Sequence, residues 1–237
     1  MKKLLLLGAS GMIAPHVIPG MESLYDLRLA DIRPHPDGKP TLPVDVTSYE
    51  QVREAACGVD AIVNFTVLRD DPVQSFAVNT MGAYHVMRAA AELGIKKVIH
   101  TGPEQVRGWY AHEFDLEDVP GAPGTGYYGI TKYLGMEICR IYARSYGIQT
   151  ICFLLHGHGP GPTEPVSGQD FPSFSIAWED LQHACRLALD IPSVPDHFQA
   201  FNLNSYLSHG KYPTDKARRI LGYAPLKRWE DCFRRIP

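Results

Sequence analysis

The chain has 237 residues, enough for one full domain with a buried core or for a large domain with a small lobe. Hydrophobic residues make up 45% of it and charged residues 21%, which excludes intrinsic disorder as the overall state. The formal net charge of −3 gives no sign of a basic surface, so we do not expect nucleic acid as a partner.

The N-terminus combines two lysines with the apolar run Leu4–Leu7, as a secretory signal would. The run ends at Gly8 and is shorter than the about 7–15 residues that the hydrophobic part of such a signal needs. A buried strand that leads into a glycine turn is the better interpretation. No stretch approaches about 18 apolar residues, so we expect no membrane contact.

In the first 155 residues, sequence patterns typical of strands and of helices alternate with the spacing of repeated βαβ units. The expected strands are Leu4–Leu7, Leu24–Ala30, Thr41–Val46, Ala61–Thr66, Lys97–Thr101 and Ile148–Leu155. The expected helices between them are Tyr49–Cys57, Val73–Leu93 and Gly129–Tyr146. This order predicts an α/β fold, a doubly wound parallel sheet of the Rossmann type.

The composition of the chain changes after residue 155. Residues 156–175 hold eight Gly or Pro and predict a long loop. The expected elements beyond it are the helix Trp178–Asp190, the strand Phe198–Leu203 and helices near Asp215–Leu221 and Trp229–Arg235. We therefore expect a domain over residues 1–155 and a small C-terminal substrate lobe over residues 156–237, intertwined with the first.

Five cysteines are scattered along the chain without a C-x-x-C pair: Cys57, Cys139, Cys152, Cys185 and Cys232. This pattern favours buried, reduced thiols over a disulfide framework or a structural zinc site. Reduced thiols are typical of a reducing compartment, so we expect a cytoplasmic location.

A glycine turn follows the first strand and opens a helix. Gly8 and Gly11 let the chain turn tightly and bring backbone N–H groups to a pyrophosphate, although an ordinary strand-to-helix turn is the alternative. Asp31 ends the second strand, about 20 residues further on, where a carboxylate can bind ribose hydroxyls. A carboxylate there repels a 2′-phosphate, which favours NAD over NADP. Arg33 nearby keeps NADP as the less favoured alternative.

Tyr128 and Lys132 form a second constellation, four residues apart on one face of a predicted helix. An ammonium beside a phenol lowers the phenol pKa, so that the tyrosinate can act as a general base nearer neutral pH. The same lysine can hold ribose hydroxyls of the cofactor. A chance surface pair is the alternative interpretation of this spacing.

Together these motifs resemble the extended short-chain dehydrogenase/reductase family, in its NAD-dependent epimerase/dehydratase group, over nearly the whole chain. The resemblance is carried by the turn from Gly8 to Ala14, Asp31, Asp45-Val46, Asn79-Thr80-Met81-Gly82, Tyr128-x-x-x-Lys132, Trp178-Glu179-Asp180-Leu181 and the stretch from Lys216 to Tyr223. Within the family, the chain looks most like the uronate-dehydrogenase branch. The shared features there are the short C-terminal lobe, Gly108-Trp109-Tyr110 and residues 175–181.

The resemblance implies which residues bind the cofactor. Asp45 and Val46 would contact adenine, Phe65 and Thr66 would line its path, and the helix of Asn79 would support the site. The full expected set is Gly8, Ser10, Gly11, Met12, Ile13, Asp31, Arg33, Asp45, Val46, Phe65, Thr66, Asn79, Tyr128, Lys132 and Leu155.

Two positions depart from the family pattern. The catalytic Ser or Thr of the family would fall at Pro103, which has no hydroxyl group. Thr101, two residues earlier, is the candidate replacement, and Glu104 or Gln105 could instead face the substrate. Leu154 stands where uronate-type relatives carry an arginine, which weakens the expectation of a free uronate as substrate.

His156 and His158 flank Gly157 in the long loop. A metal site is conceivable, but no third ligand is fixed beside them, so we expect no metal. A substrate-facing loop is the better interpretation, with His156 near the nicotinamide end. Trp109-Tyr110 could stack on a sugar or base, or simply pack in a lid.

The sequence thus predicts an NAD-dependent, sugar-modifying oxidoreductase or epimerase with Tyr128 as base, Lys132 beside it and Thr101 as a third member. The substrate would be a sugar or nucleotide-sugar, and dehydrogenase, epimerase and dehydratase chemistry all remain open. The alternative is a catalytically impaired dinucleotide-binding sensor or scaffold, because Pro103 replaces the usual hydroxyl. By resemblance we expect a homodimer that pairs through the helices Val73–Leu93 and Gly129–Tyr146.

Overall fold

The central feature of the computed structural model is a parallel sheet of seven strands in the order β10-β6-β5-β4-β1-β2-β3. The structure describes residues 1–103, 116–119, 121, 124–161, 166–167, 175–206, 211–227 and 233–234. The strands of the sheet are β1 (Lys3–Leu7), β2 (Asp26–Asp31), β3 (Leu42–Pro43), β4 (Ala61–Asn64), β5 (Lys97–Thr101), β6 (Gln149–Leu154) and β10 (Phe198–Asn202). This topology confirms the predicted doubly wound sheet.

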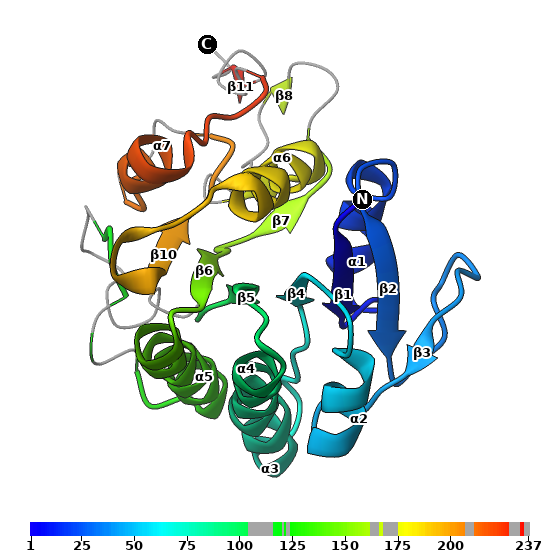
Figure 1. Ribbon diagram of the computed structural model, residues 1–237. Coiled ribbons are helices and arrows are strands. Elements are labelled where there is room, and N and C mark those ends of the chain that lie inside the picture. The colour runs from blue at the N-terminus through cyan, green and yellow to red at the C-terminus, as the bar shows by residue number, and fades with distance from the viewer. Residues whose placement is uncertain are drawn as a thin grey trace.

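Helices cover both faces of the sheet (Figure 1). One layer holds α2 (Tyr49–Ala55), α4 (Gly82–Leu93) and α5 (Tyr127–Tyr146), and the other holds α1 (Ala14–Val17), α6 (Trp178–Asp190) and α7 (Asp215–Leu221). In β1, Leu4 and Leu6 pack in the core beside α1 and α6, whereas Leu5 and Leu7 pack beside α2 and α4. A strand buried on both faces is therefore apolar at every position.

The long helix expected from Val73 to Leu93 is present but not uniform. It comprises α3 (Pro72–Ser75), a π-helical segment η2 (Phe76–Met81) and α4. Such segments tend to occur at functional sites.

Two other elements are shorter than their sequence pattern suggests. The helix after the glycine turn has only four residues and continues as a 3₁₀ turn, η1 (Ile18–Gly20). Pro15 fits the first turn of a helix, but Pro19 supplies no N–H group to continue it. The strand expected over Thr41–Val46 is reduced to the two residues of β3 at the edge of the sheet, where Pro43 is tolerated.

Residues after 155 contribute the last strand of the sheet, as well as helices that pack on it. Strand β10 pairs with β6, and α6 shares a core with α1. Two small parallel pairs lie in this part: β7 (His158–Gly159) with β9 (Ile176–Ala177), and β8 (Val166–Ser167) with β11 (Phe233–Arg234).

The helix predicted over Trp229–Arg235 is wrong at Phe233–Arg234, which form a strand against residues 166–167. The rest of that segment lies outside the described residues. Among the described residues, no helix has the length and apolar character needed to cross a membrane.

Candidate functional site

The carboxyl ends of β1 and β4 mark the point where the strand order reverses. From β1 the chain proceeds to β2 and β3 on one side, and β4 and β5 lie on the other. In open parallel sheets, ligands bind in the crevice at such a point. Four of the segments that we expect to form the site, those after β1, β4, β5 and β6, begin at this edge of the sheet.

Gly8 brings the first two of these segments together. Its φ of +80° lies in the left-handed region, and a Cβ atom added to it would stand 2.8 Å from the backbone of Phe65 and Thr66. Glycine is therefore required both for the conformation and for the space.

The backbone of the turn leaves two N–H groups for a ligand. The N–H groups of Gly8 and Ala9 donate to the carbonyl of Ala30, at 2.9 and 3.1 Å. Within the described part of the chain, no hydrogen bond occupies the N–H groups of Met12 and Ile13. These two groups are available as donors to a phosphate, and their contact with a cofactor stays a prediction. Because α1 is so short, its dipole adds little to them.

Asp31 links the glycine turn to the loop after β2. Its carboxylate accepts hydrogen bonds from the backbone N–H groups of Ser10 (3.0 Å) and Arg33 (2.9 Å). The Ser10 hydroxyl donates to the Arg33 carbonyl, and the Arg33 guanidinium donates to the Ser10 carbonyl. A carboxylate has about four acceptor positions, so Asp31 can still accept a hydrogen bond from a ribose hydroxyl.

The residues expected to contact adenine have clear structural roles. Val46 is buried against α4, and a Cβ atom at Gly82 would stand 2.8 Å from its side chain. Asp45 accepts hydrogen bonds from the backbone and hydroxyl of Thr47. Their contact with adenine stays a prediction.

Tyr128, Lys132 and Thr101 come together at the start of α5 and the end of β5. Lys132 is 1% exposed, and its Nζ donates to Thr101 Oγ1 at 2.9 Å. Burial lowers the pKa of Lys132 to about 8. Since Thr101 accepts this hydrogen bond, its own O–H remains able to donate to a substrate oxygen. Pro103, two residues on, is buried and has no hydroxyl.

One cavity of about 250 Å³ joins the glycine turn to this cluster. It is lined by Met12, Ile13, Phe65, Val67, Arg69, Thr101, Gly102, Tyr128, Lys132, Leu155, Gly157 and His158. Its described lining carries two cationic side chains, Arg69 and Lys132, and no carboxylate.

Arg69 is the charged side chain of this lining that sequence reasoning missed, alongside Val67 and Gly102. Its guanidinium carbon lies 4.9 Å from the centroid of the Tyr128 ring. The only signal in the sequence is its place five residues after β4, in a loop at the carboxyl edge of the sheet.

Two expected residues support the site from behind the cavity wall. His156 is 1% exposed, stacks on Tyr212 at 3.6 Å and shares a 2.9 Å hydrogen bond between its Nε2 and Asn202 Oδ1. Asn79 is 2% exposed and bonds the backbone of Leu68. Neither side chain lines the cavity.

Glu104, Gln105 and Trp109-Tyr110 lie outside the described residues. Among the residues that are described, no three His, Cys, Asp or Glu side chains are grouped to hold a metal ion.

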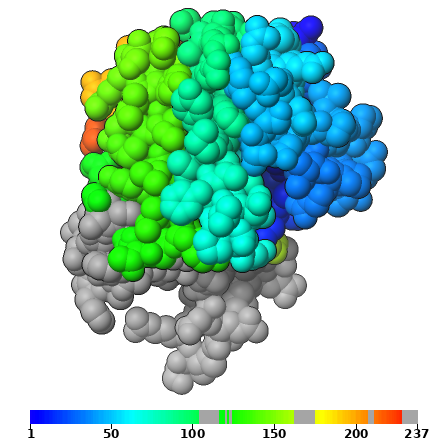
Figure 2. All heavy atoms as spheres, turned by 90° about the horizontal axis from the view of Figure 1, so that it is seen from below, coloured from blue at the N-terminus to red at the C-terminus, as the bar shows by residue number. Residues whose placement is uncertain are grey.

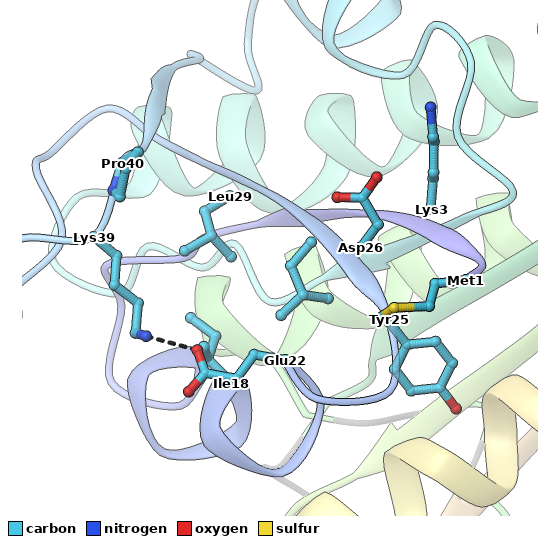
Figure 3. A pocket seen from close by; sticks show the side chains of 10 residues that line it. Met1, Lys3, Ile18, Glu22, Tyr25, Asp26, Leu29, Lys39 and Pro40 are labelled. Atoms are coloured by element: carbon cyan, nitrogen blue, oxygen red, sulfur yellow. Dashed lines mark hydrogen bonds and ion pairs between the residues drawn. The ribbon is translucent and has the colours of Figure 1, made fainter.

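A larger hollow, of about 700 Å³, lies away from this edge (Figure 3). Its lining includes Lys3 and Asp26, which begin β1 and β2, so it lies at the amino ends of these strands. Lys39 on its rim is paired with Glu22 at 2.6 Å. The smaller cavity holds the groups suited to catalysis.

Comparison with known proteins agrees with this geometry. The model of the "NAD dependent epimerase/dehydratase family" matches residues 4–177. The chain belongs to this family. The members of this family are enzymes that use NAD as cofactor, and the family description names epimerases and dehydratases.

Curated relatives include two uronate dehydrogenases. That of Pseudomonas syringae pv. tomato is 27% identical over 199 residues, which cover 81% of this chain and 71% of the relative. That of Pseudomonas putida is 28% identical over 168 residues, covering 68% of this chain and 62% of the relative.

Solved structures share the fold at lower identity. Uronate dehydrogenase from Agrobacterium tumefaciens superposes with a TM-score of 0.79 at 21% identity, covering 97% of this chain and 86% of that one. A short-chain dehydrogenase/reductase superfamily protein from the same organism, with bound NAD, gives 0.78 at 17%, covering 97% and 94%. A UDP-galactose 4-epimerase gives 0.74 at 14%, covering 97% and 95%.

Proposed function

We propose that the protein is an NAD-dependent sugar oxidoreductase in which Tyr128 removes the hydroxyl proton while a hydride leaves the same sugar carbon. The observation that carries this proposal is the shared cavity. Tyr128, Lys132 and Thr101 line it together with Met12 and Ile13 of the glycine turn. A dinucleotide laid from the turn to this cluster would bring its reactive end to the base.

NAD, when bound, supplies the hydride acceptor. The Met12 and Ile13 N–H groups would bind its pyrophosphate and Asp31 a ribose hydroxyl. Lys132 would hold the second ribose and favour the phenolate of Tyr128 through its positive charge. The Thr101 hydroxyl, fixed by Lys132, would donate to the substrate oxygen as charge develops there.

A compact sugar oxidised to a released product is the first activity to test. Two of the curated relatives are named uronate dehydrogenases. Leu154, at the position of the arginine of uronate-type enzymes, is buried in the core and does not line the cavity. A uronate would therefore have to be bound by other cations of this chain. Epimerisation remains the second candidate, supported by the match to the family that includes epimerases.

The deciding experiment follows absorbance at 340 nm with NAD and a panel of aldoses, uronates and sugar nucleotides. We expect NADH from the wild type, loss of nearly all turnover in Tyr128→Phe, and normal turnover in Tyr146→Phe, a tyrosine exposed at the far end of the same helix. NAD binding without NADH, together with an epimerised or dehydrated product, would point to internal redox chemistry. NAD binding with no product of any kind would favour the sensor or scaffold alternative.

We also infer that the protein forms a homodimer through the helical segments 76–93 and 127–146. These segments lie side by side on one face of the molecule (Figure 2). Phe76, Met81, Leu134 and Ile141 on them are large apolar residues that are 38–61% exposed. Sedimentation should give twice the mass of the 26.4 kDa chain, and Ile141→Arg should give the monomer. A monomeric wild type at micromolar concentration would contradict this. The cytoplasmic location stays a prediction.

A further inference from the structure

We propose that Arg69 is a positioning residue for Tyr128, because its guanidinium keeps a permanent positive charge against the phenol ring and so favours the phenolate. This inference rests on the proposed function, in which Tyr128 is the base. It assigns a second cation to a base for which the sequence suggested only Lys132.

The loop that carries Arg69 is firmly built. The side-chain amide of Asn79 both accepts from the Leu68 N–H (2.9 Å) and donates to the Leu68 carbonyl (2.8 Å). The Ser75 hydroxyl also donates to the Leu68 carbonyl, and the Tyr127 hydroxyl donates to the Arg69 carbonyl at 2.6 Å. The backbone at positions 68 and 69 is thus bonded to α3, η2 and α5.

This anchoring fixes the distance between the loop and the base. Tyr127 and Tyr128 are adjacent in the first turn of α5. The hydrogen bond from Tyr127 therefore holds the Arg69 backbone beside the residue whose ring the guanidinium faces at 4.9 Å. A guanidinium over an aromatic face is an attractive arrangement, and it holds the ring as well as the charge in place.

The charges around Tyr128 come from several elements. Arg69 faces it from the loop after β4, Lys132 from α5 and His158 from the segment after β6, while Thr101 of β5 is neutral. No carboxylate belongs to the described lining of the cavity.

Lys132 and His158 lose their charge under conditions where Arg69 keeps it. Burial lowers the pKa of Lys132 to about 8, and the charge of Arg69 contributes in the same direction. Burial first, and the charge of Arg69 second, lower the pKa of His158, so both disfavour the charged form of this ring. An arginine stays protonated throughout. Among the described residues that line the cavity, Arg69 is therefore the cation that still supports the phenolate above about pH 8.

The size of the effect follows from Coulomb's law. A unit charge beside the phenol, such as the Arg69 guanidinium 4.9 Å from the ring centroid, shifts the phenol pKa by about half a unit to one unit in a partly solvated cavity. The charge of Arg69 is expected to act mainly on proton transfer and less on substrate affinity.

The test is a pH titration of protein labelled with [¹³Cζ]tyrosine, in which the Tyr128 resonance is identified by its loss in Tyr128→Phe. We expect Arg69→Gln to raise the pKa of Tyr128 by about 0.5–1 unit and Arg69→Lys to restore most of the shift. Arg144→Gln is the matched control, since Arg144 is paired with Asp196 near the other end of α5 and should change nothing.

The pH profile of kcat gives a second readout. Its acidic limb should move upward by the same amount in Arg69→Gln, with little change in KM. An unchanged Tyr128 pKa in a folded Arg69→Gln overturns the inference. A raised KM for anionic sugars with an unchanged Tyr128 pKa also overturns it and makes Arg69 a substrate-binding residue. A shifted pKa in a protein that turns over no substrate upholds the inference and refutes the proposed function instead.

Discussion

At Gly8 the folded chain leaves no space for a side chain. A positive φ by itself costs an alanine only a modest amount of stability. Gly38 shows this case, because its φ is +70° and an added Cβ atom there would meet nothing within 4 Å. At Gly8 the added atom would also clash with the backbone of Phe65 and Thr66, directly after β4, which cannot move without moving the strand.

We expect Gly8→Ala to lower the free energy of unfolding by about 2–4 kcal/mol and Gly38→Ala by about 1 kcal/mol. Urea denaturation of both variants measures the difference, which isolates the steric part. Equal losses at the two positions would show that the approach of β1 to β4 is not rigid.

Lys132 is the second residue whose environment outweighs its ordinary chemistry. Its pKa falls from 10.5 to about 8 because burial disfavours the charged form. Below about pH 8 the side chain is charged in both folded and unfolded states, and the folded state carries the cost of burying the charge. Between pH 8 and 10.5 the unfolded chain binds the extra proton, so this cost disappears as the pH rises.

Lys132→Met should therefore be more stable than the wild type at pH 7, by on the order of 1–3 kcal/mol, while losing activity. The lost hydrogen bond to Thr101 offsets part of the gain. The gain should shrink as the pH rises from 8 to 10.5, as measured by thermal or urea unfolding across that range. Lys96→Met, at an exposed lysine, should show no such trend, and a pH-independent gain at position 132 would refute the lowered pKa.

At the scale of elements, Asn79 joins three of them. Its amide bonds the loop after β4 at Leu68 and also donates to the Thr131 hydroxyl of α5 at 3.0 Å. The residue lies in the π-helical segment η2, so the irregular turn directs a side chain that a regular helix would place elsewhere. Asn79 thereby sets the position of the Arg69 loop.

We expect Asn79→Ala to cost about 2–4 kcal/mol of stability, because it removes the hydrogen bonds to the Leu68 N–H, the Leu68 carbonyl and the Thr131 hydroxyl, and the Leu68 N–H loses its acceptor. Thr80→Val removes a single hydrogen bond, to the Thr131 carbonyl, and should cost about 1 kcal/mol. Equal losses of stability in the two variants, measured by urea denaturation, would mean that the hydrogen bonds of Asn79 contribute no more than the single hydrogen bond of Thr80.

For the molecule as a whole, the candidate cofactor site draws on segments that are far apart in the sequence, from Met12 to His158. The turn after β1, the loop after β4, α5 and the segment after β6 all line the cavity. A ligand that contacts all of them stabilises the native state as a unit.

NAD at about 100 times its dissociation constant should add about 2.7 kcal/mol and raise the melting temperature by about 5–10 °C. NADP at the same concentration should give a smaller shift, because the Asp31 carboxylate repels its 2′-phosphate. Asp31→Asn should reduce the difference between the melting-temperature shifts that NAD and NADP produce, as measured by differential scanning calorimetry. Equal shifts for the two cofactors in the wild type would show that Arg33 neutralises Asp31 towards the ligand.

Much of the fold could be predicted because its signals are local. An apolar run such as Leu4–Leu7 predicts a doubly buried strand, and the helices Trp178–Asp190 and Asp215–Leu221 have the bounds that their patterns indicate. The errors have different causes. Pro43 and the edge position limit the strand expected over Thr41–Val46 to two residues, whereas the helix expected at 229–235 is wrong at 233–234 because these residues pair with the distant residues 166–167.

The sequence by itself determined the parallel sheet, the glycine turn with its acidic partner, and the pairing of Tyr128 with Lys132, since four residues span one helical turn. Only the tertiary structure decided that Thr101 meets Lys132, 31 residues away, and that Arg69 faces Tyr128. Those contacts depend on which strands lie side by side, because the order β6-β5-β4-β1 brings the ends of separate strands to one edge. Periodicity and backbone sterics act over a few residues, whereas the composition of the cavity is set by packing across the whole sheet.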